Sequence, residues 1–332
     1  MNLQHRIYLL SRLGEYILST EVAWQKAKEK ANWENGWFIP EFVELASKNI
    51  ALSFLQKDIL EKWAGGHQIP ASSTNSRTIG IVMAGNIPLV GFHDWLSVFI
   101  SGHKAIIKLS SKDQVLFKHL IEKLAEWDPL VNKFTSFSEM LKGCDAYIAT
   151  GSNNSSRYFE YYFRKYPTII RKNRTSIGIL SGKETNEELR KLADDVYLYF
   201  GLGCRNVTKI YVPSGYDFIP LLDAFNKYRH LADHNKYKNN YDYNLALHLL
   251  NKKYYMTNGS ILLVEETAFF SPISQLNYEY YSDTDKLSDS LKNHPELQSI
   301  TGEGYVPFGQ SQYPAISDYA DGVNTLKFLS TL

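Results

Sequence analysis

The sequence predicts an α/β protein with two domains, each built as a doubly wound parallel sheet with helices on both faces. Two observations lead to this prediction. Of the 332 residues, 44% are hydrophobic, which is more than one small core needs. Short runs rich in β-branched residues also alternate with longer amphipathic runs from residue 78 onward, and this alternation is typical of parallel sheets with crossover helices.

A helical segment is expected before the first sheet, over residues 3–64. Apolar residues recur there at intervals of three and four, Pro40 suits the first turn of a helix, and the sequence AGGH at 64–67 ends the run. The stretch IPASSTNSR at 69–77 has no periodicity and is interpreted as a linker.

The first domain is expected to cover residues 1–175 and to contain three strand-and-helix pairs. Its strands are expected over 78–84, 104–110 and 145–150, and its helices over 88–101, 113–127 and 154–166. Ligands of such sheets bind at the carboxyl ends of the strands. This edge is therefore where we expect the chemistry of the first domain.

The second domain is expected over residues 176–310, followed by a C-terminal extension over 311–332. Strands are expected at 176–181, 208–213, 260–266 and 325–329, and helices at 186–200 and 218–228.

Composition and charge narrow the classes of function. A net charge of +1 argues against nucleic acid or an anionic membrane surface as a partner, because such partners need clustered Lys and Arg. The apolar stretch 79–102 contains Asn86, Pro88, His93 and Asp94, and is therefore not read as a membrane span. The N-terminus lacks the pattern of a secretion signal.

The two cysteines, Cys144 and Cys204, are 60 positions apart and follow no metal-ligand or disulfide spacing. No metal is expected, and a reducing cytoplasm is the expected location. A free cysteine usually packs as a small hydrophobe, and we expect this of Cys144. Cys204 lies instead in YFGLGCRN at 199–206, where Gly, Arg and Asn would make a poor core. A thiol beside Arg205 is favoured as thiolate, which makes Cys204 a candidate nucleophile.

The first expected strand ends in AGNIP. Gly85 permits a close approach of the backbone, Asn86 offers a side-chain amide, and Pro88 suits the start of a helix. An ordinary strand-to-helix turn with an Asn cap is an open alternative. The dinucleotide fingerprint GxGxxG does not follow this strand.

From about residue 77 to the C-terminus, the sequence resembles the aldehyde dehydrogenase superfamily. The stretches TIGIVMAGNIPLVGFHDWLSVFISGHKAIIKLSSKD and YFGLGCRNVTKIYVP carry the likeness. Within the superfamily, the chain is similar to the fatty acyl-CoA reductases related to the bacterial luminescence reductase. An aldehyde-dehydrogenase-like fold is therefore implied. The resemblance also implies a homo-oligomer in which a C-terminal strand, here NTLKFLSTL, crosses to a neighbouring subunit.

The resemblance implies roles for the residues of the first domain. Asn86 would stabilise an oxyanion, and Lys108 would contact the cofactor ribose. NAD-preferring members carry a Glu three positions after that Lys, where this chain has Ser111. Lys112 would then pair with a 2′-phosphate, so NADPH is the expected cofactor.

The motif TGSN at 150–153 matches a turn near the cofactor phosphates, which implies Gly151 and Ser152 as binding residues; a plain Ser-capped helix is the alternative. Cys204 would be the nucleophile. Lys209 lies five positions after Cys204, where the family also has a basic residue. In LLVEETAFFSP, Glu266 would orient the nicotinamide ribose.

One departure from the family points to the substrate. Hydrolytic members carry a Glu that activates water roughly thirty positions before the Cys, whereas TIIRKNRTSIGIL at 168–180 contains no acid. The resemblance thus implies NADPH-dependent reduction of a fatty acyl-CoA, or of an acyl carrier, to an aldehyde. A CoA-acylating aldehyde dehydrogenase and a catalytically silent nucleotide-binding relative are the alternatives. His93 and His234 are candidates for the proton donor, although a structural role is expected for both.

Overall fold

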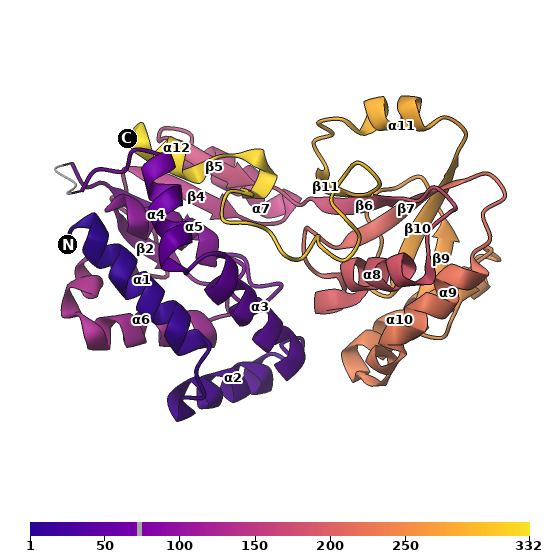
Figure 1. Ribbon diagram of the computed structural model, residues 1–332, viewed down its shortest axis with the longest axis horizontal. Helices are drawn as coiled ribbons and strands as arrows, with labels where there is room; N and C mark the ends of the chain where they lie inside the picture. The colour runs from indigo at the N-terminus through magenta and orange to yellow at the C-terminus, as the bar shows by residue number, and fades with distance from the viewer. Residues whose placement is uncertain (72–74) are drawn as a thin grey trace. The chain divides into compact units, whose positions relative to one another are not determined.

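A computed structural model describes residues 1–71 and 75–332, so the expected linker lies partly outside the described residues. The chain divides into two compact units (Figure 1). The first unit comprises Met1–Asn173 and Pro314–Leu332, and the second comprises Arg174–Tyr313. Each unit contains one sheet with helices packed against it, which confirms the predicted α/β class.

The described sheet of the first unit has five parallel strands in the order β3-β2-β1-β4-β5. The strands are β1 (Thr78–Val82), β2 (Lys104–Lys108), β3 (Thr135–Phe137), β4 (Ala146–Thr150) and β5 (Thr168–Arg171). The helices between them are α5 (Phe92–Ser101), α6 (Val115–Trp127) and α7 (Asn153–Phe163), with a 3₁₀ turn η1 (Pro129–Lys133) before β3. The expected strands and helices are present, and the short strands β3 and β5 are additional.

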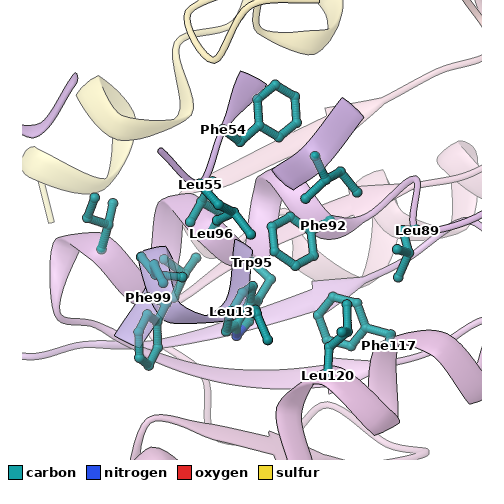
Figure 2. Packing of buried hydrophobic residues seen from close by; sticks show 14 of the residues in the cluster. Leu13, Phe54, Leu55, Leu89, Phe92, Trp95, Leu96, Phe99, Phe117 and Leu120 are labelled. Carbon is teal, nitrogen blue, oxygen red and sulfur yellow. The ribbon is translucent and has the colours of Figure 1, made fainter. Parts of the chain in front are cut away.

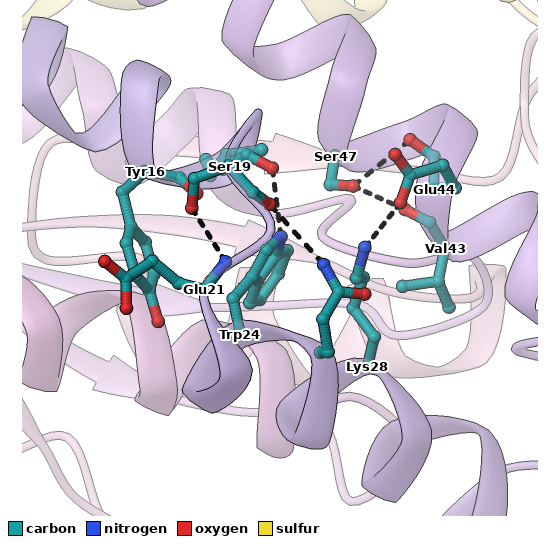
Figure 3. A network of polar contacts seen from close by, with 10 residues as sticks. Tyr16, Ser19, Glu21, Trp24, Lys28, Val43, Glu44 and Ser47 are labelled. Carbon is teal, nitrogen blue, oxygen red and sulfur yellow. Dashed lines mark hydrogen bonds and ion pairs between the residues drawn. The ribbon is translucent and has the colours of Figure 1, made fainter.

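The expected N-terminal helical segment is confirmed as four helices. They are α1 (Leu3–Ile17), α2 (Val22–Glu34), α3 (Pro40–Ser53) and α4 (Lys57–Gly66). Figure 3 shows the polar contacts between the first three: Trp24 Nε1 donates to the Ile17 carbonyl at 3.0 Å, and Lys28 pairs with Glu44 at 2.5 Å. The first bond satisfies a buried polar atom, and the second joins a largely buried Lys to an exposed Glu.

The core of the first unit lies between the sheet and helices α1, α5 and α6. Figure 2 shows its aromatic centre, where the rings of Trp95 and Phe117 meet edge-on with centroids 5.7 Å apart. Leu89, from the loop between β1 and α5, is 2% exposed and belongs to the same cluster. The end of β1 is therefore anchored in the core.

The described sheet of the second unit has six strands in the order β11-β6-β7-β10-β9-β8. They are β6 (Thr175–Ile179), β7 (Val207–Pro213), β8 (Met256–Thr257), β9 (Leu262–Glu265), β10 (Gln275–Tyr281) and β11 (Leu297–Gly302). β8 pairs antiparallel with β9, and the other pairs are parallel. β8, β10 and β11 were not expected from the sequence.

The helices of the second unit lie on both faces of its sheet, with α8, α9 and α10 on one side and α11 on the other (Figure 1). They are α8 (Asn186–Tyr197), α9 (Ile219–Phe225), α10 (Asn235–Leu250) and α11 (Thr284–Leu291), with 3₁₀ turns η2 (Leu198–Gly201) and η3 (Asn226–Asp233). A capping box between Thr185 and Glu188 starts α8.

The C-terminal segment differs from the prediction. Residues 325–329, expected as a strand, form the helix α12 (Thr325–Ser330) after a 3₁₀ turn η4 (Ala320–Gly322). Asn324 caps this helix by accepting from the Lys327 amide at 2.9 Å, and Leu326 and Leu329 are both buried, three positions apart. The expected crossing strand is therefore wrong for the described structure, and the segment belongs to the first unit.

A buried ion pair holds this segment in place. Arg171, at the end of β5, pairs with Asp94 at 2.7 Å and donates to Thr325 Oγ1 at 2.9 Å and to the Ala320 carbonyl at 2.5 Å.

Within residues 1–71 and 75–332, no helix has the length and apolar character needed to cross a membrane.

Candidate active site

Three neighbouring strands of the first unit bring the predicted catalytic residue Asn86 and most of the predicted cofactor residues to one edge. β2, β1 and β4 are adjacent and parallel, so their carboxyl ends meet there. Lys108 ends β2, Asn86 follows β1, and Gly151 follows β4. Lys108, Ser111 and Lys112 are exposed. This edge therefore combines an amide and two accessible cations, a donor set suited to a phosphate-bearing ligand.

Residues 83–91 form the turn that carries Asn86, here called the Asn86 turn. Asn86 is half-buried, and Leu89 has a left-handed backbone with φ 57°. The Leu89 amide donates to Asp113 Oδ2 at 2.6 Å. A Cβ on Gly85 would lie 2.6 Å from Ser110 Oγ, so only glycine fits there. The Asn86 turn is thus packed directly on the loop after β2.

The third element of this edge is the start of α7. Ser152 is the N-cap and its side chain accepts from the Ser155 amide at 3.3 Å. A Cβ on Gly151 would lie 2.9 Å from the side chains of Phe159 and Ser155. The Ser-capped helix is therefore observed, and a phosphate role for Gly151 and Ser152 stays a prediction.

In the second unit, residues 199–206 form the turn that carries Cys204, here called the Cys204 turn. It begins with three consecutive left-handed residues, Tyr199 (φ 55°), Phe200 (φ 56°) and Gly201 (φ 74°). Left-handed backbone is unfavourable for residues with a Cβ, at about 1 kcal/mol or more each. Tyr199 and Phe200 are almost fully buried, so packing holds them. Cys204 itself is half-buried.

Asn206 holds the Cys204 turn together from inside. Its side chain is fully buried, and Oδ1 accepts from the Gly203 amide at 2.8 Å. Its Nδ2 donates to the carbonyls at the end of α8, those of Asp195 (3.1 Å), Val196 (3.4 Å) and Leu198 (2.8 Å). One side chain therefore ties the residue before Cys204 to the helix that leads into the turn.

The sheet supports the turn from the other side. Ser176 Oγ, on the neighbouring strand β6, donates to the Cys204 carbonyl at 3.1 Å, and the Ser176 amide donates to the Asn206 carbonyl at 3.0 Å. The turn thus sits at the amino end of β7. Cys144, in contrast, is 3% exposed and burial raises its pKa, so its predicted packing role is confirmed and thiolate formation there is unfavourable.

Glu266 begins a loop over residues 266–274, here called the pinned loop. Glu266 Oε2 accepts from Lys253 Nζ at 2.6 Å, and this bond holds the pKa of Glu266 below its usual value. The loop starts after β9 and ends at Ser274, whose carbonyl accepts from Leu262, the first residue of β9. It therefore runs back along the whole length of that strand.

Four consecutive carbonyls of the pinned loop are held by side chains of β7 and β10. The bonds run from Lys209 to Thr267 (2.6 Å), from Asn277 to Ala268 (2.9 Å), from Thr208 to Phe269 (2.7 Å) and from Asn277 to Phe270 (3.1 Å). Lys209 is fully buried and also pairs with Glu279 at 2.5 Å. Its role in the structure is therefore to fix the loop that starts at Glu266.

The two candidate proton donors have structural partners. His93 Nε2 donates to the Ile316 carbonyl at 2.8 Å, which joins α5 to the C-terminal segment. The ring of His234 lies 4.7 Å from that of Phe200, centroid to centroid, at the base of the Cys204 turn.

Across the ranges that the structure describes, no group of three or more His, Cys, Asp or Glu side chains could hold a metal ion.

Sequence reasoning missed the residues that shape these turns. Asp113 and Asn277 carry no motif, and only their burial reveals them. Asn206 offered a signal, because an Asn at the end of a Gly-rich turn commonly bonds to the nearby backbone.

Comparison with known proteins identifies the relatives of this arrangement. A family model described as acyl-CoA reductase (LuxC) matches residues 48–220, just over half of the chain. No curated protein sequence matches the chain. The fold is similar to that of solved structures that include aldehyde dehydrogenases, and the three described next each cover 91% of this chain.

Aldehyde dehydrogenase 21 from Physcomitrella patens, in complex with the product succinate, has a TM-score of 0.68 with 11% identity, over 74% of its own chain. An NAD+ complex of aldehyde dehydrogenase from Bacillus cereus has a TM-score of 0.65 with 12% identity, over 72% of its own chain. An NADP-dependent enzyme from E. coli has a TM-score of 0.65 with 11% identity, over 73% of its own chain. These likenesses establish the aldehyde dehydrogenase fold predicted from the sequence.

Proposed function

The chain belongs to the acyl-CoA reductase (LuxC) family, and on this premise we propose that it reduces a fatty acyl-CoA to the aldehyde with NADPH, through an acyl group bound to Cys204. The observation that carries the proposal is the construction of the Cys204 turn. A half-buried thiol follows three left-handed residues, and the backbone on either side of it is fixed by Asn206 and Ser176. Backbone strain of this kind clusters at functional sites.

In the proposed reaction the Cys204 thiolate attacks the thioester carbonyl carbon, and a new carbon–sulfur bond forms. The bond to the CoA sulfur breaks, and CoA leaves as a thiolate. NADPH supplies the hydride that reduces the enzyme-bound thioester. The resulting thiohemiacetal loses its carbon–sulfur bond, which releases the aldehyde and restores the Cys204 thiolate, while one proton is taken up overall.

Asn86 and the Cys204 amide are proposed to stabilise the oxyanion that forms in both steps. Loss of one such donor typically costs about 3 kcal/mol of transition-state stabilisation. We therefore expect Asn86→Ala to lower kcat by roughly 100-fold. The absence of an acid from residues 168–180 supports reduction of the acyl-enzyme rather than its hydrolysis, because no carboxylate there would activate a water.

Lys108, Ser111 and Lys112 are proposed to favour NADPH over NADH. Their exposed side chains lie at and just after the end of β2. A 2′-phosphate there would pair with Lys112, and Ser111 offers no carboxylate that would repel it. Lys112→Glu should raise the KM for NADPH about tenfold and change the KM for NADH less than twofold. Lys104→Glu, at the exposed opposite end of the same strand, is the matched control. An equal effect of both variants on NADPH would contradict this assignment.

The decisive experiment is mass spectrometry of the protein after incubation with palmitoyl-CoA in the absence of NADPH. We expect an added palmitoyl group on the peptide that contains Cys204 and none on the peptide that contains Cys144, which serves as an internal control. Cys204→Ala should remove the adduct. Acylation of Cys144 alone, or of neither cysteine, would rule out the proposed intermediate.

The same protein distinguishes the two alternatives. A CoA-acylating aldehyde dehydrogenase would turn over faster with aldehyde, NADP and CoA than with acyl-CoA and NADPH. A catalytically silent relative would show no turnover in either direction, and Cys204→Ala would change nothing. We further propose a cytoplasmic location, a homo-oligomeric state, and acyl-CoA or an acyl carrier as the acyl donor.

A further inference from the structure

Leu89 of the Asn86 turn is held by a hydrogen bond to a side chain outside the turn. Leu89 is held in a left-handed conformation with its side chain buried in the core (Figure 2). Leu89 lies between β1 and α5, so its amide takes part in the backbone hydrogen bonds of neither element. That amide donates to Asp113 Oδ2 at 2.6 Å, and the bond fixes the one residue of the turn whose conformation is unfavourable.

The acceptor is an unusual choice for a buried position. Asp113 is 6% exposed, and its second oxygen, Oδ1, is buried and accepts no hydrogen bond from any described residue. A buried carboxyl with an unsatisfied oxygen destabilises a fold relative to an apolar side chain of similar size. Burial also raises the pKa of Asp113 to about 7. Stability therefore does not explain the presence of an acid here.

The position of Asp113 joins two parts of the candidate site. It follows Ser111 and Lys112 in the loop after β2, and its Cβ would lie 3.2 Å from a Cβ on Gly85. The same carboxyl group bonds to Leu89, three positions after Asn86. A shift of this carboxyl would move the Asn86 turn relative to the strand end on which it rests.

We propose that Asp113 is a positioning residue for Asn86: through the Leu89 amide, its carboxyl group holds the turn so that the Asn86 side chain is presented to the reacting carbonyl. This inference rests on the proposed function, because it assigns Asp113 to the oxyanion step. Asp113 contacts neither substrate nor cofactor in this account.

A matched pair of variants separates positioning from folding. Asp113→Asn keeps an oxygen that can accept from the Leu89 amide, whereas Asp113→Leu removes the acceptor and also removes the buried unsatisfied oxygen. We expect Asp113→Leu to lower kcat for palmitoyl-CoA reduction by about tenfold, with KM changed less than twofold and the unfolding midpoint close to that of the wild type. Asp113→Asn should retain more than half of the activity.

Asp145→Leu is the control for removing a carboxylate that caps a strand. Asp145 Oδ2 accepts from the Thr78 amide at 2.7 Å, at the amino end of β1. The variant therefore also removes a bond from a backbone amide to a carboxylate, but at the end of β1 that lies away from the Asn86 turn. This variant should leave kcat unchanged.

A double-mutant cycle with Asn86→Ala tests whether Asp113 acts through Asn86. In the Asn86→Ala background, Asp113→Leu should lower kcat less than twofold, because the group that it positions is already absent. Equal losses in both backgrounds would overturn the inference, as would wild-type kcat in Asp113→Leu.

Hydrogen exchange of the peptide covering residues 84–91 supplies a readout that needs no activity. Exchange should be faster in Asp113→Leu than in Asp113→Asn or Asp145→Leu, and unchanged exchange would overturn the inference. Failure of the proposed function has a different signature, namely an Asn86→Ala variant with wild-type kcat or a Cys204 that palmitoyl-CoA does not acylate.

Discussion

The Asn86 turn and the Cys204 turn both contain large residues with left-handed backbone, but they are held in different ways. Leu89 is held by one bond from Asp113. The Cys204 turn is held by the Asn206 side chain through one accepted and three donated bonds, and by Ser176 from the neighbouring strand. The left-handed residue of the first turn is held by one side-chain bond, and the Cys204 turn is held by several.

The buried carboxyl groups near the two turns show the same contrast. Asp195, in α8, accepts from the amides of Gly309 (2.7 Å) and Ser311 (3.0 Å) and from the Ser311 hydroxyl (2.7 Å). Asp113 accepts from Leu89 alone among the described residues. Fully bonded buried groups make a structure rigid, whereas partly bonded ones leave it easier to displace. We infer that the Cys204 turn is held more rigidly than Leu89 in the Asn86 turn.

The largest effect is expected from removing the support of the Cys204 turn. Asn206→Leu keeps the volume but leaves the Gly203 amide and three carbonyls without their partner, so the unfolding free energy should fall by about 4 kcal/mol. Urea unfolding followed by circular dichroism measures this change. Asn251→Leu, which removes one exposed bond to the Leu247 carbonyl at the end of α10, should cost less than about 1 kcal/mol. Equal costs for the two variants would show that the Asn206 bonds stabilise the Cys204 turn no more than an exposed bond stabilises the end of α10.

The next effect is a dependence of stability on pH. Burial raises the pKa of Asp113 to about 7, above its unfolded value near 4, so the folded state binds this proton more tightly. Stability from this group is therefore complete below about pH 4 and is lost as the pH rises to about 7. Between pH 5 and pH 8, the wild type should lose about 3 kcal/mol relative to Asp113→Asn.

Asp195 sharpens this test because burial raises its pKa only to about 6. The difference in unfolding free energy between the wild type and Asp195→Asn should therefore become constant about one pH unit lower than the corresponding difference for Asp113→Asn. Urea titrations at half-unit steps from pH 5 to pH 8 would resolve the two curves. A gap that stays constant with pH for Asp113→Asn would show that its carboxyl titrates normally.

The smallest effect compares one glycine from each turn. Gly85→Ala places a Cβ 2.6 Å from Ser110 Oγ, and this overpacking should cost about 2 kcal/mol; Ser110→Gly should restore most of the loss. Gly201→Ala has space, because the nearest atom would be 3.6 Å away, but its φ of 74° should cost about 1 kcal/mol. Thermal unfolding of the three variants measures both. Failure of Ser110→Gly to rescue Gly85→Ala would show that the clash is not with Ser110.

The sequence predicted the parts of the fold that have a regular hydrophobic pattern. The alternation from residue 78 onward was sufficient for the first unit, apart from β3 and β5, which have three and four residues and are too short to show a period. Residues 325–329 were expected as a strand because the run is short and apolar. The Asn324 cap and the buried pair Leu326 and Leu329 determine the helix instead.

The candidate site was predicted from family resemblance, and its supports were not. The alternation indicated parallel strands, and the observed strand order places Asn86, Lys108 and Gly151 at one sheet edge. Asp113 and Asn277 act through tertiary bonds to distant backbone atoms, and a single sequence carries no periodic signal for such bonds. The roles of Asp113 and Asn277 are visible only in the three-dimensional structure.

The pinned loop has a consequence for how this chain can change over time. Its path over residues 267–270 is fixed through four main-chain oxygens, and the anchoring groups all belong to β7 and β10. Mutational drift within the loop therefore leaves its anchors intact, whereas drift at Thr208, Lys209 or Asn277 does not. A designer who wished to alter what the loop touches could randomise the loop and keep those three side chains.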